Sequence, residues 1–340
     1  MDKNLIIEAK FSKQIPGLDI LKFVMALLIV AIHSEAVKGL KYINEIAEPL
    51  INSAVPVFFV VSSFLLFRKM RINSKNEEIN GLSILRHFTY RLFLLYTFWL
   101  AVQIPLVLYT RHYLSMNFYE FIGNFILDIG LRSTFHGAWF FSALVVGVWI
   151  IFRAGKIFND KMIWILPFCI TMYTYHANSL PIEQQALWNW YYDNINNPQN
   201  SFPVSLFWIS IGYIMANPRI VNYMSSIKSN YLVGGGILAW IVCIFGIDIR
   251  VIIVVSIFIM SFKWKGNYKP IHRIMRQSSI LIFTLHFIYI GIFRLLFPKI
   301  EWFQHGLILY VFLLIMCFVS SLVILKLKDY KYFSWLKFAY

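Results

Sequence analysis

The sequence has little charge for its length, which places most of the chain in a membrane. Of its 340 residues only 14% are Asp, Glu, Lys or Arg, whereas about 25% is usual for a soluble protein. Hydrophobic residues make up 59% of the chain, and the mean hydropathy is +0.65. We therefore expect an integral membrane protein rather than a soluble domain with a polar surface.

Cysteine and several catalytic motifs are also scarce or missing. Cys169, Cys243 and Cys317 each lie inside an apolar run without a CxxC spacing, so we predict neither a disulfide nor a metal site. HxxxxD, GxSxG, HExxH and P-loop patterns are absent from the sequence, which removes support for soluble-type hydrolases and ATP-driven machines. No convincing cleavage site follows the first apolar run, so we expect that run to remain as a helix.

Ten apolar runs are suited to helices that cross the hydrocarbon core, which takes about 20 residues. In lipid the backbone must pair within each segment, so helices are the expected structure. We predict an all-α protein with about ten transmembrane helices, a tail at 1–17, a membrane domain at 18–326 and a second tail at 327–340. The expected helices lie near 18–37, 51–67, 92–110, 134–152, 162–177, 202–217, 231–247, 249–262, 278–297 and 305–325.

The positive charges are distributed unevenly between alternate loops. Most of the 31 Lys and Arg residues fall in the two tails and in the loops that follow even-numbered helices. By the positive-inside rule these segments face the cytoplasm, so both termini are predicted to be cytoplasmic. The same distribution accounts for the net charge of +15 without a nucleic-acid partner.

The first apolar run carries two ionisable residues, Lys22 and His33. Eleven residues along an α-helix rotate by about 1100°, so both side chains lie on one face, about 16 Å apart along the axis. An ionisable residue within a membrane span is a functional candidate. A simpler interpretation stays open, in which Lys22 reaches the headgroups and pairs with Asp19, and His33 marks the outer boundary of the helix.

Several stretches resemble, in order, the motifs of the membrane acyltransferase family 3. GLDILKFVMALLIVAIH is similar to the opening motif of that family, which has Arg or Lys, ten residues, and then His. The resemblance is collinear and extends over about 17–325. The later stretches that carry it are SAVPVFFVVSSFLL (53–66), YRLFLLYTFW (90–99), HGAWFFSAL (136–144) and SSILIFTLHF (278–287).

The sequence departs from this pattern at two places. Ser63 stands where the family commonly has Gly. The paired Arg of a cytoplasmic loop is incomplete, because Arg91 fits the second position but Phe88 occupies the first. Arg86 and His87 lie close enough in the sequence to substitute, or the donor site is altered.

The resemblance implies a multi-pass enzyme of the bacterial plasma membrane. Such an enzyme moves an acyl group, typically acetyl, from cytoplasmic acyl-CoA to a hydroxyl of a cell-envelope saccharide or lipid-linked glycan. Acetyl-CoA is then a co-substrate, and no bound cofactor is expected. His33 is the expected base or covalent acyl carrier, because imidazole titrates near physiological pH. Lys22, Arg86 and Arg91 are expected to hold the phosphates of the donor.

Other residues are candidates for supporting roles. Glu35 is expected to orient His33 or to bind the acceptor, and Ser62 to position groups beside the first helix, unless it only makes a helix–helix hydrogen bond. Trp139 is expected to line the acyl path, unless it belongs to an interfacial belt. Asp19, His136 and His286 are further candidates for such supporting roles.

Two other classes of function remain open. A transporter or exporter of polysaccharide or acylated intermediates would use the same helices, although few carboxylates lie within the spans, which disfavours a proton relay. An inactive partner in an envelope complex is the other possibility.

Overall fold

The computed structural model describes residues 14–73, 81–110, 115–130, 132–135, 137–160, 162–195, 197–198, 201–264 and 266–340. This part of the chain is helical and contains no strand, which confirms the predicted all-α class. Six segments of it are long and apolar enough to cross a membrane. A seventh candidate arises if Phe202–Met215 and Pro218–Ser226 count as one span. The chain is a helical membrane protein with several candidate spans, and the full set of ten stays a prediction.

Each of the ten predicted ranges overlaps a helix. Four of these helices, α8, α10, α12 and α13, have only 12, 14, 16 and 14 residues, which is less than the length of about 20 that a straight crossing requires. The ten are α2 (Pro16–His33), α4 (Ala54–Asn73), α5 (Gly81–Thr110), α7 (Trp139–Ile157), α8 (Ile165–His176), α10 (Phe202–Met215), α12 (Ser229–Ile244), α13 (Arg250–Lys263), α14 (Pro270–Leu296) and α15 (Leu307–Leu327).

Further helices lie in segments predicted as loops or tails. They are α3 (Lys41–Ile51), α6 (Phe118–Gly130), α9 (Ala186–Asn194) and α11 (Pro218–Ser226), together with the 3-10 segments η2 (Ala177–Ser179), η3 (Ile182–Gln184), η5 (Glu301–Phe303) and η6 (Lys331–Ala339). The helix α3 has a polar row and an apolar row, so it is amphipathic rather than uniformly apolar like α15. A search for long apolar runs does not detect a helix of this kind.

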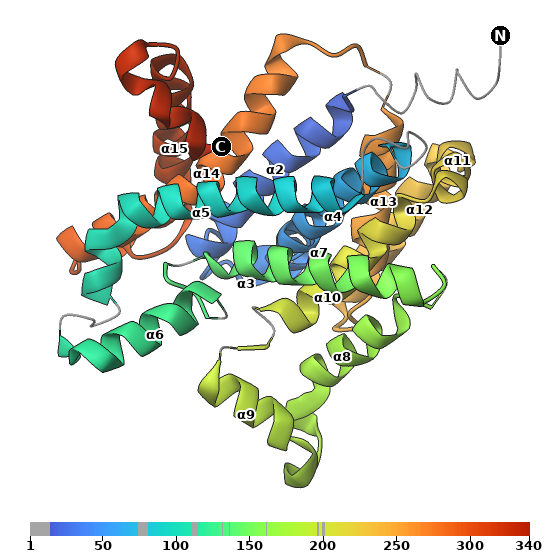
Figure 1. The fold of residues 1–340 in the computed structure, drawn as a ribbon, viewed down its shortest axis with the longest axis horizontal. Coiled ribbons are helices and arrows are strands. Elements are labelled where there is room, and N and C mark those ends of the chain that lie inside the picture. The colour runs from blue at the N-terminus through green and yellow to red at the C-terminus, as the bar shows by residue number, and fades with distance from the viewer. Residues whose placement is uncertain are drawn as a thin grey trace. The chain divides into compact units, whose positions relative to one another are not determined.

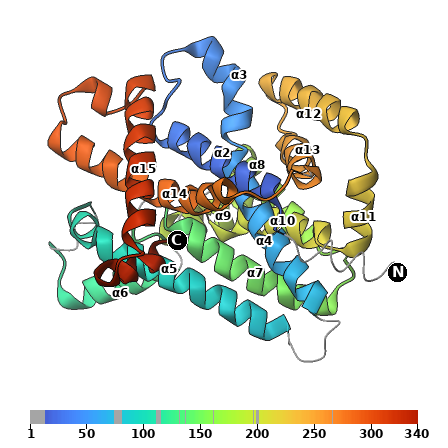
Figure 2. The ribbon, with the colours of Figure 1, turned by 90° about the horizontal axis from the view of Figure 1, so that it is seen from above.

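The chain forms two compact units. The first unit combines Met1–Val61 with Pro218–Tyr340, and the second comprises Ser62–Asn217. The chain passes from the first to the second within α4, and both units can be followed by colour in Figures 1 and 2.

In the first unit, α2 packs against α14, α13 and α15. Its buried residues include Leu18, Leu21, Met25 and Ile29, a spacing of three to four that lays one stripe against the neighbouring helices. Gly17 allows α13 to approach closely, because a Cβ at this position would overlap the carbonyl oxygen of Ser261. The first turn of α2 is therefore fixed by backbone contact.

The helices α2 and α14 run side by side, as Figures 1 and 2 show. Asp19 lies beside Arg276, and further along both helices His33 lies beside His286. The two helices consequently run in the same direction. This direction is the one that the predicted first and ninth spans require, since both have odd positions in the order.

In the second unit, α10 packs against α7 and α8, and α7 packs against α5. Trp149 of α7 donates from its indole nitrogen to the hydroxyl of Thr89 in α5, at 2.9 Å. Ten of the 14 residues of α10 are buried, and none is exposed. A helix that is apolar on all sides is typical of such a buried position.

Candidate functional site

The helix α2 carries Lys22 and His33 on one uninterrupted stretch of 18 residues. Pro16 begins the helix at a position where a missing N–H costs nothing. Ala26 and Ile29 lie between Lys22 and His33 on the same face, and both are fully buried. Since the Lys22 side chain is only 14% exposed, this face of α2 is turned toward the interior of the first unit.

An ionic cluster lies at the amino-terminal end of this face. The Asp19 carboxylate is buried and pairs with two cations, the Lys22 ammonium at 3.8 Å and the Arg276 guanidinium at 3.8 Å. The pairing of Asp19 with Lys22 is the contact that the simpler interpretation predicted, while the reach of Lys22 to the headgroups and the boundary role of His33 stay predictions. Two cations against one carboxylate leave a local surplus of positive charge, which suits a phosphate group.

Arg276 is a site residue that sequence reasoning missed. It was assigned only to a positively charged loop, because it lies more than 250 residues from Asp19 in the chain. In the structure it belongs to α14, which begins at Pro270 rather than near 278. The earlier start brings its guanidinium to the interface with α2. The only signal in the sequence was the presence of Arg276 two residues before the SSILIFTLHF stretch.

The segment before α14 closes this end of the site. The Lys269 amide donates to Nδ1 of His272 at 2.8 Å, which caps the helix. The ring of Tyr268 lies 5.4 Å from that of His272. Burial raises the pKa of the Tyr268 phenol above its ordinary value, and the Asp19 carboxylate acts in the same direction. The phenol is therefore a proton-bearing neighbour of Asp19.

The carboxy-terminal end of the same face is aromatic instead. The His33 ring lies 4.7 Å from that of Phe287, edge to face, and 5.3 Å from that of His286. His286 is fully buried, and its Nδ1 lies 2.9 Å from the Ile282 carbonyl oxygen. A carbonyl oxygen can only accept, so Nδ1 of His286 carries a hydrogen and donates it to Ile282. The structure thus brings together His33 and His286.

Backbone hydrogen bonds fix the end of α2 where His33 lies. The Arg294 guanidinium donates to the His33 carbonyl oxygen at 3.4 Å and to that of Gln304 at 3.0 Å. The Gly306 amide donates to the Ser34 carbonyl oxygen at 2.7 Å. These contacts tie α2 to α14 and to the segment before α15.

Glu35 follows in an uncommon backbone conformation, with a φ of 50°. A residue with a Cβ seldom adopts this left-handed region, and such residues cluster at functional sites. Its carboxylate pairs with the Lys38 ammonium at 2.6 Å. This hydrogen bond is the main reason that the pKa of Glu35 lies below its ordinary value. The role of orienting His33 stays a prediction.

The remaining predicted residues lie in the second unit. Ser62 is half-buried in α4, and Trp139 opens α7, where its amide donates to the Ser133 hydroxyl at 3.2 Å. Arg86 and Arg91 are exposed on α5. Placing these two in a loop was wrong, because α5 begins at Gly81. His136 lies outside the described residues.

A second charged cluster in that unit was not predicted. Asp160 accepts from the Arg71 guanidinium at 3.2 Å and from the Asn217 amide at 2.7 Å. The Arg71 guanidinium also stacks on the ring of Tyr213, 4.4 Å from its centroid. Since these side chains satisfy one another, we interpret the cluster as a structural clamp. No group of three or more potential metal ligands was found in the described part of the chain.

Comparison with known proteins gives one limited similarity. No family model matches the chain, and no solved structure matches it. A stretch of 136 residues is 29% identical to a protein of Enterococcus faecalis named amino-acid racemase. This stretch makes up 38% of the present chain and 17% of the relative. The chain therefore spans only a small part of the relative that it matches, and the name describes that protein.

Proposed function

We propose that this protein is a membrane O-acyltransferase that moves an acyl group from cytoplasmic acyl-CoA to a hydroxyl of a cell-envelope saccharide or lipid-linked glycan. The acyl group is proposed to be acetyl, and the membrane the bacterial plasma membrane. Both details come from the resemblance of the sequence to membrane acyltransferase family 3.

One observation carries the proposal. The helix α2 carries Lys22 near its start, with Arg276 of α14 beside it, and the His33 imidazole near its end, on one inward face. The donor needs cations for its phosphates and a basic group near its thioester. The rise of an α-helix sets about 16 Å between Lys22 and His33, roughly half the thickness of the hydrocarbon core. This supports a donor anchored at one membrane surface whose acyl group is used deeper in the bilayer.

The His33 imidazole allows two routes of acyl transfer, because it can act as a base or as a nucleophile. In direct transfer, His33 takes the proton of the acceptor hydroxyl as its oxygen attacks the thioester carbonyl carbon. The carbon–sulfur bond breaks, and the CoA thiolate leaves and takes up a proton. In the covalent route, an imidazole nitrogen of His33 attacks first and releases CoA, and the hydroxyl then takes the acyl group from the ring. His286 packs against His33 in either case and is proposed to fix its orientation.

The test uses purified protein in lipid nanodiscs with labelled acetyl-CoA and glycans extracted from the envelope. His33→Ala is expected to lower transfer about 10²- to 10⁴-fold, the usual contribution of a general base. His305→Ala is the matched control, because this histidine pairs with Glu301 before α15, and it is expected to retain wild-type activity. Full activity of a well-folded His33→Ala protein would remove His33 from the mechanism.

A transporter is the second candidate, and Asp19 is the observation that favours it. This carboxylate is buried within a candidate span beside two cations, an arrangement that also occurs along ion pathways. A transporter in liposomes would move labelled saccharide without consuming acetyl-CoA. The enzyme would release CoA in proportion to the acylated product.

A further inference from the structure

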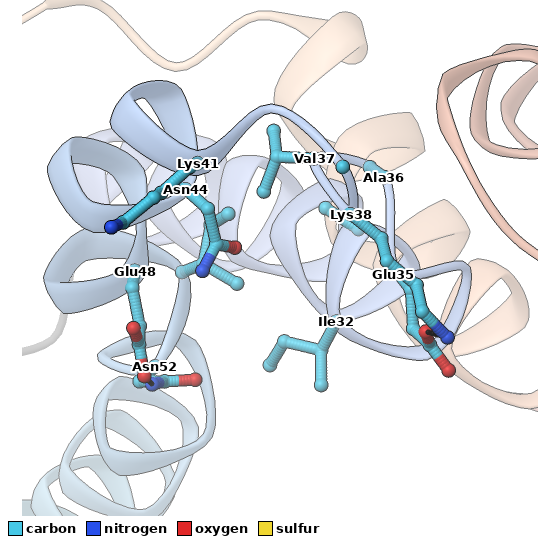
Figure 3. A pocket seen from close by; sticks show the side chains of 12 residues that line it. Ile32, Glu35, Ala36, Val37, Lys38, Lys41, Asn44, Glu48 and Asn52 are labelled. Atoms are coloured by element: carbon cyan, nitrogen blue, oxygen red, sulfur yellow. Dashed lines mark hydrogen bonds and ion pairs between the residues drawn. The ribbon is translucent and has the colours of Figure 1, made fainter.

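A pocket of about 420 Å³ lies at the carboxy-terminal end of α2, between the turn that follows this helix and α3. Figure 3 shows Asn44, Glu48 and Asn52 along α3, with Glu35 and Lys38 on the turn at the other side. All of the lining residues belong to the first unit. The volume falls within the range of roughly 300–1,000 Å³ that is usual for small-molecule sites.

The wall formed by α3 presents a row of polar groups. Asn44, Glu48 and Asn52 follow one another at intervals of four residues, so they lie on one face of the helix or at its end. The Asn52 amide donates to the Glu48 carboxylate at 3.3 Å. Amides both donate and accept, and a carboxylate accepts from hydroxyls. The row therefore offers both kinds of hydrogen-bonding partner.

The charges of the lining residues balance. Glu35 and Glu48 oppose Lys38 and Lys41, and Glu35 is already paired with Lys38. An anionic ligand would need a surplus of cations, as at Asp19, Lys22 and Arg276. A neutral ligand with many hydroxyls instead uses donors and acceptors in equal measure. The chemistry of the lining therefore favours an uncharged saccharide.

The pocket also lies next to the proposed catalytic residue. Ala31 and Ile32, which line it, directly precede His33, and Glu35 follows two residues later. The left-handed backbone of Glu35 sharply turns the chain at this point. Since His33 itself faces Phe287 and His286, a ligand in the pocket must extend past the end of α2 to reach its imidazole.

We propose that this pocket holds one sugar ring of a neutral oligosaccharide acceptor, so that a hydroxyl of the adjoining ring reaches His33. The inference rests on the proposed acyltransferase function for its catalytic meaning. The binding of the saccharide is a separate property and can be measured without acyl-CoA.

The binding test is saturation-transfer NMR on the full chain in nanodiscs, with maltotriose and triacetylchitotriose as probes. The wild-type protein is expected to transfer saturation to the protons of at least one of the two trisaccharides. Asn44→Ala and Glu48→Gln are expected to reduce that signal at least fivefold. Glu45→Gln is the matched control, because Glu45 is exposed on α3 and does not line the pocket, and it is expected to bind as the wild type does.

Three results separate the two proposals. Saturation of neither probe by the wild type, or equal saturation by Asn44→Ala, Glu48→Gln and Glu45→Gln, overturns the pocket proposal. Retained binding by His33→Ala together with lost binding by Asn44→Ala supports it, even if no acyl transfer is ever found. If acyl transfer depends on His33 and Asn44→Ala binds as the wild type does, the pocket proposal is wrong. The acyltransferase proposal then stands. Thermal unfolding of each variant checks that the protein is intact.

Discussion

The two ends of α2 are held in place by different physical means. At the amino-terminal end, Asp19, Lys22 and Arg276 form an ionic cluster. At the carboxy-terminal end, His33 lies among the rings of His286 and Phe287, and backbone hydrogen bonds fix the chain. One helix therefore has an ionic cluster near its start and packed aromatic rings near its end.

The difference explains which chemistry suits each end. A buried carboxylate is tolerated only with partners, so Asp19 keeps two cations in place and leaves a net positive charge for an anionic ligand. Aromatic rings lie beside the His33 imidazole at the other end, and an imidazole is the side chain that exchanges protons near physiological pH. Substitutions at one end should therefore affect donor affinity, and substitutions at the other should affect the rate of transfer.

The largest effect on the amino-terminal end of α2 is expected from a substitution that pushes α2 away from α13. Gly17→Ala places a Cβ on the Ser261 carbonyl, and overpacking of this kind costs about 1–3 kcal/mol. We expect the upper end of that range, because a backbone atom cannot move away cheaply. Thermal and SDS-induced unfolding measure the loss. Gly234→Ala in α12 is the control, since no described atom lies within 4 Å of its Cβ position, and a loss as large there would contradict the explanation.

The next test concerns the aromatic end. His286→Phe keeps a ring beside His33 but removes the imidazole, so we expect the kcat of transfer to fall about 10- to 100-fold. A change in positioning is expected to leave the KM for acyl-CoA unaltered, because the cations lie at the other end of α2. Steady-state kinetics with both substrates separate kcat from KM. An unchanged kcat would reduce His286 to a packing residue.

At the ionic end, Arg276→Gln tests donor affinity. A charge-assisted hydrogen bond contributes about 1.5–3 kcal/mol, and partial exposure of Arg276 places the effect at the lower end. We expect the KM for acyl-CoA to rise about tenfold with little change in kcat. Arg273→Gln is the matched control, because Arg273 is exposed on the same helix. Equal effects of the two variants would indicate nonspecific attraction of the donor.

The smallest expected effect is a pH dependence at Glu35. Its pKa is lowered by Lys38, so the folded state gains stability above the ordinary value of 4.5 and loses it as the pH falls through the lowered pKa. The pair is exposed, and such pairs contribute less than about 1 kcal/mol. Lys38→Gln should therefore be less stable than the wild type at pH 7, and the difference should shrink as the pH falls through the lowered pKa of Glu35. A difference of the same size throughout the acidic range would contradict this assignment.

The apolar runs predicted where helices occur but not where they begin and end. Backbone pairing in lipid makes any long apolar run helical, so α2, α14 and α15 were found by composition alone. Polar residues continue a helix beyond the apolar run, as at the end of α4 and the start of α5. The amphipathic helix α3 was missed for the opposite reason, because its apolar residues form only one row.

Only the part of the candidate site that lies on one helix was predicted from the sequence. Lys22, His33 and Asp19 lie on one helix, so helical geometry relates them without any tertiary information. Arg276 joins Asp19 only through the packing of α14 on α2, which no local pattern encodes. The pocket also depends on tertiary structure, because its two walls come from the turn after α2 and from α3.

The Arg294 guanidinium of α14 and the Gly306 amide before α15 donate to the carbonyl oxygens of His33 and Ser34, so the connection between α14 and α15 affects the end of α2. An insertion or deletion between Leu296 and Leu307 would shift the carbonyl groups of His33 and Ser34 and thereby tilt the imidazole. Changes confined to that short connection would therefore alter the orientation of His33 while the residue itself stays the same.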